Sequence, residues 1–346
     1  MSIQGLMKVP AEERDVQWLA YSLQEAIQLE WATIPPYLCA CWSIKTGVGI
    51  PPLTVEMRST IQSIVIQEML HMGLACNMLA SIGGSPNICS ENFTPKYPCE
   101  LPGHVHEGLV IGLAGLSRDE PGNKDQVYKF MQIESPEDPL AFRNDEGFCT
   151  IGEFYEDVSL VFDQVNPKLE PNQQLTNDLM SDLVIVRSVA DAKASIDLIK
   201  RQGEGTSSSP FVDGNTREIA PAHELAHYYR FGEIHAERRL QLDLTVPTGW
   251  SFTGDCFPFP DAKDLFLMAE VPPGGYPESD EFDLAYTKVL RLLHDGWAQG
   301  DGSKLGDAIQ TMDGDLTSAA IALLKAGIRT GSNQAIKGPD FRFLQP

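Results

Sequence analysis

Two histidines of the chain each follow a glutamate by three residues. Glu68 and His71 lie in "IQEMLHMG", and Glu224 and His227 lie in "HELAHYYRF". On an α-helix, residues three apart project from one face about one turn apart, so both side chains of a pair can bind one ion or two neighbouring ions. Carboxylates and imidazoles suit iron or manganese. The two pairs therefore predict a transition-metal site.

The neighbours of Glu68 and His71 make this pair more specific than its spacing alone. They are the apolar residues Ile64, Val65, Ile66, Met69, Leu70 and Met72. An unpaired carboxylate in such surroundings is costly, and a bound metal ion is one way to offset that cost. The alternative is a buried Glu–His pair held by a hydrogen bond.

Glu30 is a single acid in the apolar stretch "QLEWATIPPYLCA". Helical periodicity over residues 15–44 and 55–82 predicts an antiparallel helical hairpin. Glu30 and Glu68 lie about equally far from its loop, so helices of equal rise bring them to matching heights. We therefore expect Glu30 to face Glu68.

Two prolines, Pro35 and Pro36, follow Glu30 within the same expected helix. They cannot donate hydrogen bonds to the carbonyls of Trp31 and Ala32, so they predict a bend. That bend either surrounds a cavity beside Glu30 or fits the helix against later ones, and the sequence leaves both open.

Three acids compete for the remaining positions of a metal site. Glu204 ends an expected helix whose successor runs back antiparallel, which brings Glu204 near the height of Glu224 or His227. Glu153 is a further candidate, but Thr150-x-x-Glu153 also fits a capping box, in which the acid bonds the backbone at a helix start. The choice among Glu153, Glu204 and Glu224 stays open at this point.

Helical periodicity recurs along the chain, whereas strand signals are weak. The expected helices span residues 15–44, 55–82, 120–132, 150–165, 176–202, 218–240, 280–298 and 303–328. Glu-x-x-His motifs on two helices, with one glutamate from each of two more, form the dinuclear site of ferritin-like bundles. We therefore predict an all-α fold: a ferritin-like bundle with a long crossover over residues 1–242, and a helical extension packed on it over residues 243–346.

Composition limits the classes of partner. The chain has 346 residues, with 26 Lys and Arg against 48 Asp and Glu, for a formal charge of -22. Such a surface repels phosphate backbones and anionic lipid, so we expect neither a nucleic acid nor a membrane partner. The sequence has no apolar stretch of roughly 18 residues, so we expect a cytoplasmic protein. Composition leaves the oligomeric state undetermined.

Several segments resemble a known family. They are "AIQLEWATIPPYLCACWSIK", "IVIQEMLHMGLACNMLASIGGSP", "FMQIESPED", "TIGEFYEDV", "IDLIKRQGEG" and "HYYRFGEI", with "YTKVLRLLHDGW" and "GPDFRF" near the end. They are similar to the ferritin-like domain family of the iminophenyl-pyruvate dimer synthases, which are enzymes of bisindole pigment and indolocarbazole biosynthesis. The resemblance covers most of the chain, and its first two motifs are specific.

The resemblance implies a ferritin-like bundle in secondary metabolite biosynthesis, where an oxidised amino acid is coupled as an imine. The positions that match are Glu30, Glu68, His71, Glu153, Glu204 and His227. The dimer synthases are far longer, and the resemblance does not extend to their haem-bearing portion. The coupling reaction itself is therefore not carried over to this chain.

Together these observations predict a non-haem dinuclear oxidoreductase. We expect two iron ions, with manganese as the alternative to iron. The protein would use O₂ to oxidise a small organic substrate, an amino-acid derivative. One alternative is an iron-storage protein of ferritin type that has no organic substrate. Another is a metal-free bundle that serves as a structural or partner-binding module.

Overall fold

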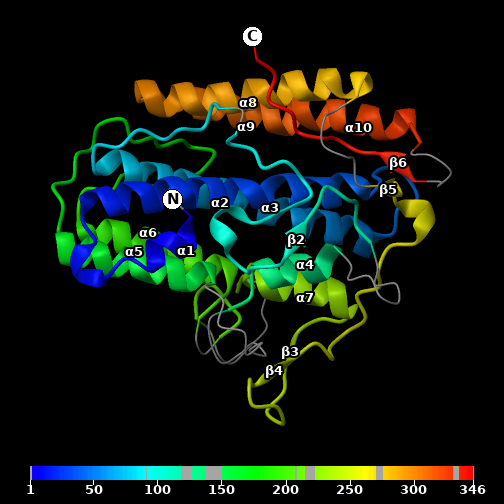
Figure 1. Ribbon diagram of the computed structural model, residues 1–346. Coiled ribbons are helices and arrows are strands. Elements are labelled where there is room, and N and C mark those ends of the chain that lie inside the picture. The colour runs from blue at the N-terminus through cyan, green and yellow to red at the C-terminus, as the bar shows by residue number, and fades with distance from the viewer. Residues whose placement is uncertain are drawn as a thin grey trace.

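Two long antiparallel helices, α2 (Val16–Ser43) and α3 (Pro52–Ser81), form the centre of the fold in the computed structural model (Figure 1). The structure describes residues 2–90, 92–117, 126–136, 150–206, 209–214, 223–269, 276–329 and 335–345. The side chains of α2 and α3 are buried on nearly all sides over much of their length, as expected for helices covered by other elements.

The second pair of bundle helices is divided into two halves. α4 (Gln126–Ile133) packs beside α7 (His227–Ala236), and α5 (Ile151–Val165) packs beside α6 (Val189–Gly203). The two halves lie toward opposite ends of the α2–α3 hairpin (Figure 1). The ends of α4 and α6 and the starts of α5 and α7 therefore lie toward the middle of the bundle.

A further layer of helices covers the other side of α2 and α3. It consists of α8 (Asp280–Gln299), α9 (Gly302–Thr311), a π-helical turn (Met312–Leu316) and α10 (Thr317–Ala326). One continuous hydrophobic core contains residues of this layer and of the hairpin, so the layer is packed on the bundle. The predicted division of the chain at residue 242 stays a prediction.

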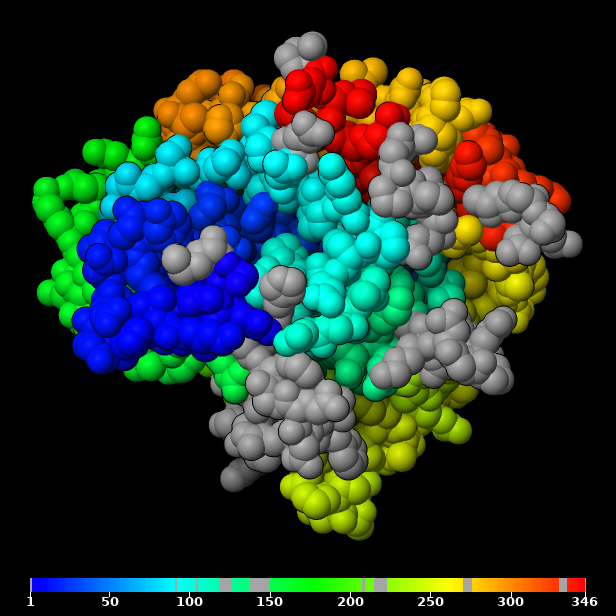
Figure 2. Space-filling model, viewed as in Figure 1, coloured from blue at the N-terminus to red at the C-terminus, as the bar shows by residue number. Residues whose placement is uncertain are grey.

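The remaining elements are short. They are α1 (Ile3–Met7), the 3-10 turns Ala11–Glu13, Pro102–His104, Ala262–Asp264 and Pro277–Ser279, and the strands β1 (Cys99–Glu100), β2 (Val110–Ile111), β3 (Gln241–Leu242), β4 (Trp250–Ser251), β5 (Met268–Ala269) and β6 (Ile336–Lys337). β1 pairs with β2 and β3 with β4, both antiparallel, and β5 with β6 in parallel. The segment that carries β3 and β4 protrudes from the body (Figure 2). The predicted all-α fold is confirmed, and no helix among the described residues is long and apolar enough to cross a membrane.

α2 passes through Pro35 and Pro36 without ending. The carbonyl of Ala32, to which Pro36 cannot donate, accepts a hydrogen bond of 2.7 Å from the buried Tyr97 hydroxyl. A side chain thus replaces the missing backbone donor, and the helix continues with Glu30 held in its buried part.

Two expected helices are shorter in the structure. The helix expected over residues 176–202 begins only at Val189, because Ser188 and Asp191 form a capping box there. The helix expected over residues 218–240 is α7, preceded by an extended Ala226. Residues 120–125 and 218–222, where the sequence predicts helix, lie outside the described residues.

The chain before α6 packs against α3 as turns rather than as a helix, and Asn77 holds it there. The Asn77 side chain donates to the carbonyls of Leu175 (2.8 Å) and Val184 (2.9 Å) and accepts from Leu175 N (2.9 Å) and Trp297 Nε1 (3.1 Å). Asn77 is fully buried. One side chain thus joins α3, this segment and α8.

Replacing Asn77 should therefore destabilise the protein. Asn77→Ala leaves several buried polar groups without partners, and we expect the free energy of unfolding in urea to fall by about 2–4 kcal/mol. The exposed turn residue Asn172 provides the control, and Asn172→Ala should have little effect. Equal midpoints for the two variants would contradict this account of the segment.

Candidate metal centre

Five acidic and imidazole side chains converge in the interior of the bundle. Glu30 comes from α2, Glu68 and His71 from α3, Glu134 from the residue after α4, and His227 from the first turn of α7. They form two buried groups, Glu30–Glu68–His71 and Glu68–Glu134–His227, and within each group the ligand atoms lie within 4.8 Å of one another. Glu68 belongs to both groups.

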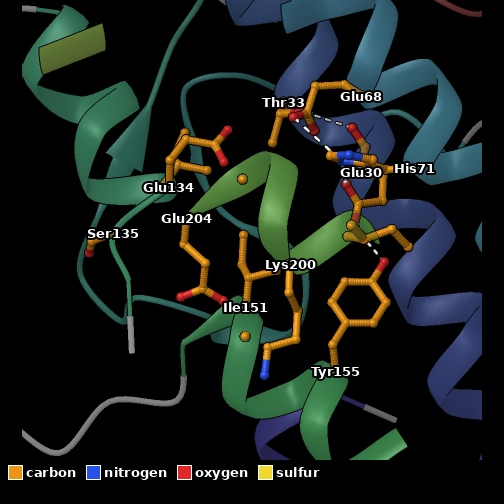
Figure 3. A pocket seen from close by; sticks show the side chains of 14 residues that line it. Glu30, Thr33, Glu68, His71, Glu134, Ser135, Ile151, Tyr155, Lys200 and Glu204 are labelled. Atoms are coloured by element: carbon orange, nitrogen blue, oxygen red, sulfur yellow. Dashed lines mark hydrogen bonds and ion pairs between the residues drawn. The ribbon is translucent and has the colours of Figure 1, made fainter. Parts of the chain in front are cut away.

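Each imidazole directs its Nδ1 atom toward the carboxylates. His71 Nδ1 lies 3.5 Å from Glu30 Oε2 and 3.7 Å from Glu68 Oε1 (Figure 3). His227 Nδ1 lies 2.8 Å from Glu68 Oε1 and 3.5 Å from Glu134 Oε2. The two rings are nearly parallel, at an angle of 25° and with centroids 5.5 Å apart.

Glutamine side chains fix the orientation of both rings. His71 Nε2 lies 2.9 Å from Gln202 Oε1, and His227 Nε2 lies 3.1 Å from Gln67 Oε1. An amide oxygen only accepts hydrogen bonds, so Nε2 carries the hydrogen in each ring. In the neutral ring the lone pair is then on Nδ1, which faces the carboxylates.

In each of the three carboxylates, one oxygen accepts a hydrogen bond from a hydroxyl group. Tyr155 donates to Glu30 Oε1, Tyr37 donates to Glu134 Oε1 (2.6 Å), and Thr33 donates to Glu68 Oε2 (2.9 Å). In each carboxylate it is the other oxygen that faces an imidazole. Three oxygens and two nitrogens are thereby presented to one another.

The electrostatics of this cluster are unfavourable without added positive charge. Burial, together with the neighbouring Glu134 and Glu30, raises the pKa of Glu68 well above its usual range. Burial lowers the pKa of His227. Burial also acts to lower the pKa of His71, but the hydrogen bond to Glu30 and the charge of Glu68 outweigh it and raise that pKa. Without a cation, Glu68 and His71 therefore hold their protons more tightly than the free groups do.

The donor atoms fit metal ions. His227 Nδ1 is buried and makes no hydrogen bond to any residue that the structure describes, although it lies 2.8 Å from Glu68 Oε1. Ligand atoms about 2.1 Å from a shared ion, at right angles, lie about 3 Å apart. An orphaned nitrogen beside an acidic oxygen at this spacing is suited to a shared cation, so each group can hold one ion.

Glu153 and Glu204 lie outside both groups. Glu153 is exposed, and its carboxylate accepts a hydrogen bond of 2.9 Å from Thr150 N, so it completes the capping box at the start of α5. Glu204 caps the end of α6 and lines a pocket beside the cluster. The structure therefore gives Glu153 a helix-capping contact and leaves Glu204 near the site.

Glu224 does not share a helix with His227, contrary to the expectation from "HELAH". α7 begins at His227, and Glu224 lies in an extended segment whose backbone pairs with Val212. Its half-exposed carboxylate accepts a hydrogen bond of 3.3 Å from Gln67 Nε2. Glu224 thus contacts the glutamine behind His227 and not the cluster.

Glu134 takes the place that the sequence analysis assigned to one of these acids. It follows Val127 and Phe130 on the buried face of α4 at helical spacing. An acid on an otherwise apolar helix face is the signal that identified Glu30, and it was present here too. The role of Glu30, Glu68, His71 and His227 as metal ligands stays a prediction, and the sequence analysis did not name Glu134.

A narrow pocket through the middle of the bundle is lined by residues of the cluster, and its space for water-sized molecules is about 30 Å³. Its lining includes Glu30, Glu68, His71 and Glu134, the apolar Ile133, Ile151 and Ile199, and the polar Ser135, Lys200 and Glu204. Figure 3 shows Glu30, Glu68 and His71 gathered on one side, with Ser135, Lys200 and Glu204 apart from them. Gly203 leaves room for the Glu134 side chain, since a Cβ atom on residue 203 would lie 3.2 Å from Glu134 Oε2.

Comparison with known proteins agrees with this fold. Among curated proteins, none matches the chain. A ferritin-like protein from Caulobacter vibrioides has a similar structure, with a TM-score of 0.60 and 21% sequence identity over 93% of this chain and 97% of that one. This likeness concerns the fold alone. The model of the ferritin-like family matches residues 23–236, which is more than half of the chain and contains all five clustered residues. The chain therefore belongs to the ferritin-like family.

Proposed function

We propose that the protein binds two transition-metal ions, one in each group, with Glu68 shared between them. Glu30 and His71 would complete one group, and Glu134 and His227 the other. Iron is the metal that best suits this mixture of carboxylate and imidazole donors in a ferritin-like bundle, with manganese as the alternative. The inward-facing Nδ1 atoms of both rings support this proposal.

We further propose that the site is that of an oxidoreductase that uses O₂ on a small organic molecule. Bound ions of this kind supply Lewis acidity and the capacity to exchange electrons with O₂. The chain's own residues orient and shield the site: Tyr37 and Tyr155 hold the outer oxygens of Glu134 and Glu30. Both tyrosines are buried, and burial raises their pKa values well above the usual range, so both remain hydrogen-bond donors at neutral pH.

The proposal of an organic substrate is based on the pocket beside the cluster. The pocket reaches the acids of both groups, and three isoleucines give it apolar walls. Ser135, Lys200 and Glu204 add polar groups for the ends of a small molecule. An amino-acid derivative, the class implied by the resemblance to the dimer synthases, combines such apolar and polar parts.

Loss of the shared acid should remove both ions. We expect the purified protein to bind one ion for each group, and Glu68→Ala to bind none while circular dichroism still reports a helical protein. Glu153→Ala is the matched control, because Glu153 caps a helix outside the cluster and its loss should leave metal content unchanged. Elemental analysis measures both. Full metal content in Glu68→Ala would refute the proposed site.

Metal binding should release protons, and the metal affinity should rise with pH. The raised pKa values of Glu68 and His71 mean that the folded, metal-free protein holds protons that an ion must displace. A raised pKa also means that the folded state binds its proton more tightly than the unfolded state does. That contribution to stability is present at low pH and is lost as pH rises through the folded-state pKa.

Calorimetry in two buffers of different ionisation enthalpy would count the released protons. The melting temperature of chelator-treated protein, followed against pH, would report the loss of stability. The prediction fails if the metal affinity does not change with pH.

Oxygen consumption tests the activity itself. The iron-loaded protein should consume O₂ continuously when a suitable organic co-substrate is supplied, and amino-acid-derived imines and aromatic amines are the first compounds to test. Uptake of Fe²⁺ and O₂ that stops once a mineral core has filled would instead identify an iron-storage protein. Metal binding without either behaviour would rule out the oxidoreductase.

A further inference from the structure

The two halves of the cluster are closely matched in their inner contacts. Each half combines the shared Glu68 with a second carboxylate and one Nδ1 atom. Each second carboxylate, Glu30 or Glu134, accepts a tyrosine hydroxyl on its outer oxygen. These contacts alone give no reason for the two halves to bind an ion differently.

The two halves differ in what lies behind the imidazoles. Gln202 Oε1 accepts from His71, and among the described residues it accepts from no charged group. Gln67 Oε1, which accepts from His227, also accepts a hydrogen bond from Arg230 Nη2. Among the residues that the structure describes, only the His227 half is therefore linked by one shared amide oxygen to a guanidinium group.

Arg230 is a buried cation. Its side chain is 9% exposed, Nη1 donates to Ser63 Oγ (3.0 Å), and Nε has no hydrogen-bond partner among the described residues. Burial lowers the pKa of Arg230 to about 10, which leaves the group charged at neutral pH. Glu224 is the one described acid paired with it, at 3.6 Å from Nη1, and that acid is half exposed.

A buried positive charge opposes a second positive charge nearby, because the protein interior screens charges less than water does. The guanidinium also draws electron density from the oxygen of Gln67, which then supports the His227 ring less well as a donor to a metal. Both effects act on the Glu134–His227 half and leave the Glu30–His71 half with its neutral Gln202.

We propose that Arg230, acting through Gln67, makes the Glu134–His227 half the weaker of the two metal sites, so that the ions load in order. This rests on the proposed function, since it presupposes that both halves bind metal. The Glu30–His71 half fills first. Glu224 opposes the effect of Arg230. It partly neutralises the guanidinium charge, and it fixes the amide of Gln67 by accepting a hydrogen bond from Gln67 Nε2.

Anaerobic titration of chelator-treated protein with Fe²⁺, followed by calorimetry, tests this inference. The unaltered protein should show two binding steps of unequal affinity. Arg230→Gln removes the cation, and we expect it to tighten the second step about tenfold, whereas Glu224→Gln should weaken the second step about tenfold. The first step should not change, and Arg230→Lys should restore the unequal pattern.

Glu56→Gln is the matched control, because Glu56 is also a half-exposed acid paired with an arginine, Arg239, but away from the cluster. It should leave both steps unchanged. A merely structural role for the network would weaken binding in both Arg230→Gln and Glu224→Gln, and that result would overturn the proposal. So would equal affinities in the unaltered protein. Absence of metal binding altogether would overturn the proposed function itself.

Discussion

The structure depends on the burial of three carboxylates beside two imidazoles in the core of a helical bundle. Such a cluster is unfavourable unless positive charge enters it. The surrounding residues orient the acids and the imidazoles around the place where that charge would lie. Hydroxyl groups occupy one oxygen of each acid, and glutamines occupy one nitrogen of each ring, so the remaining lone pairs face one another. The metal proposal follows from this arrangement of lone pairs more than from the residue types.

The hairpin of α2 and α3 was predictable because long apolar periodicity determines helices directly. The convergence of Glu30, Glu68 and His71 was predictable for a related reason: acids and imidazoles on buried helix faces need polar or charged partners. Their heights in the hairpin followed from the rise of a helix. Tyr97, which supplies the donor missing at Pro36, was not predictable, because it comes from a segment without periodicity.

The second half of the site was predicted less well because it depends on where helices begin and end. The spacing of Glu224 and His227 resembled that of Glu68 and His71, yet the helix starts at His227 and excludes Glu224. Glu134 follows a short helix, so its place on the buried face was less evident than that of Glu30. At Glu153 the sequence left a metal ligand and a capping box open, and the structure contains the capping box.

The division of the second helix pair places helix ends beside the cluster, where a continuous helix would leave no entrance to the pocket. Glu30, Glu68 and His71 lie on the central hairpin of α2 and α3, whereas Glu134 and the outer lining of the pocket come from the ends of the divided helices. Altered side chains at those ends can reshape the pocket without moving Glu30 and Glu68, which lie on the hairpin. The fold thus allows the entrance of the pocket to change in shape while the part of the cluster on the hairpin keeps its geometry.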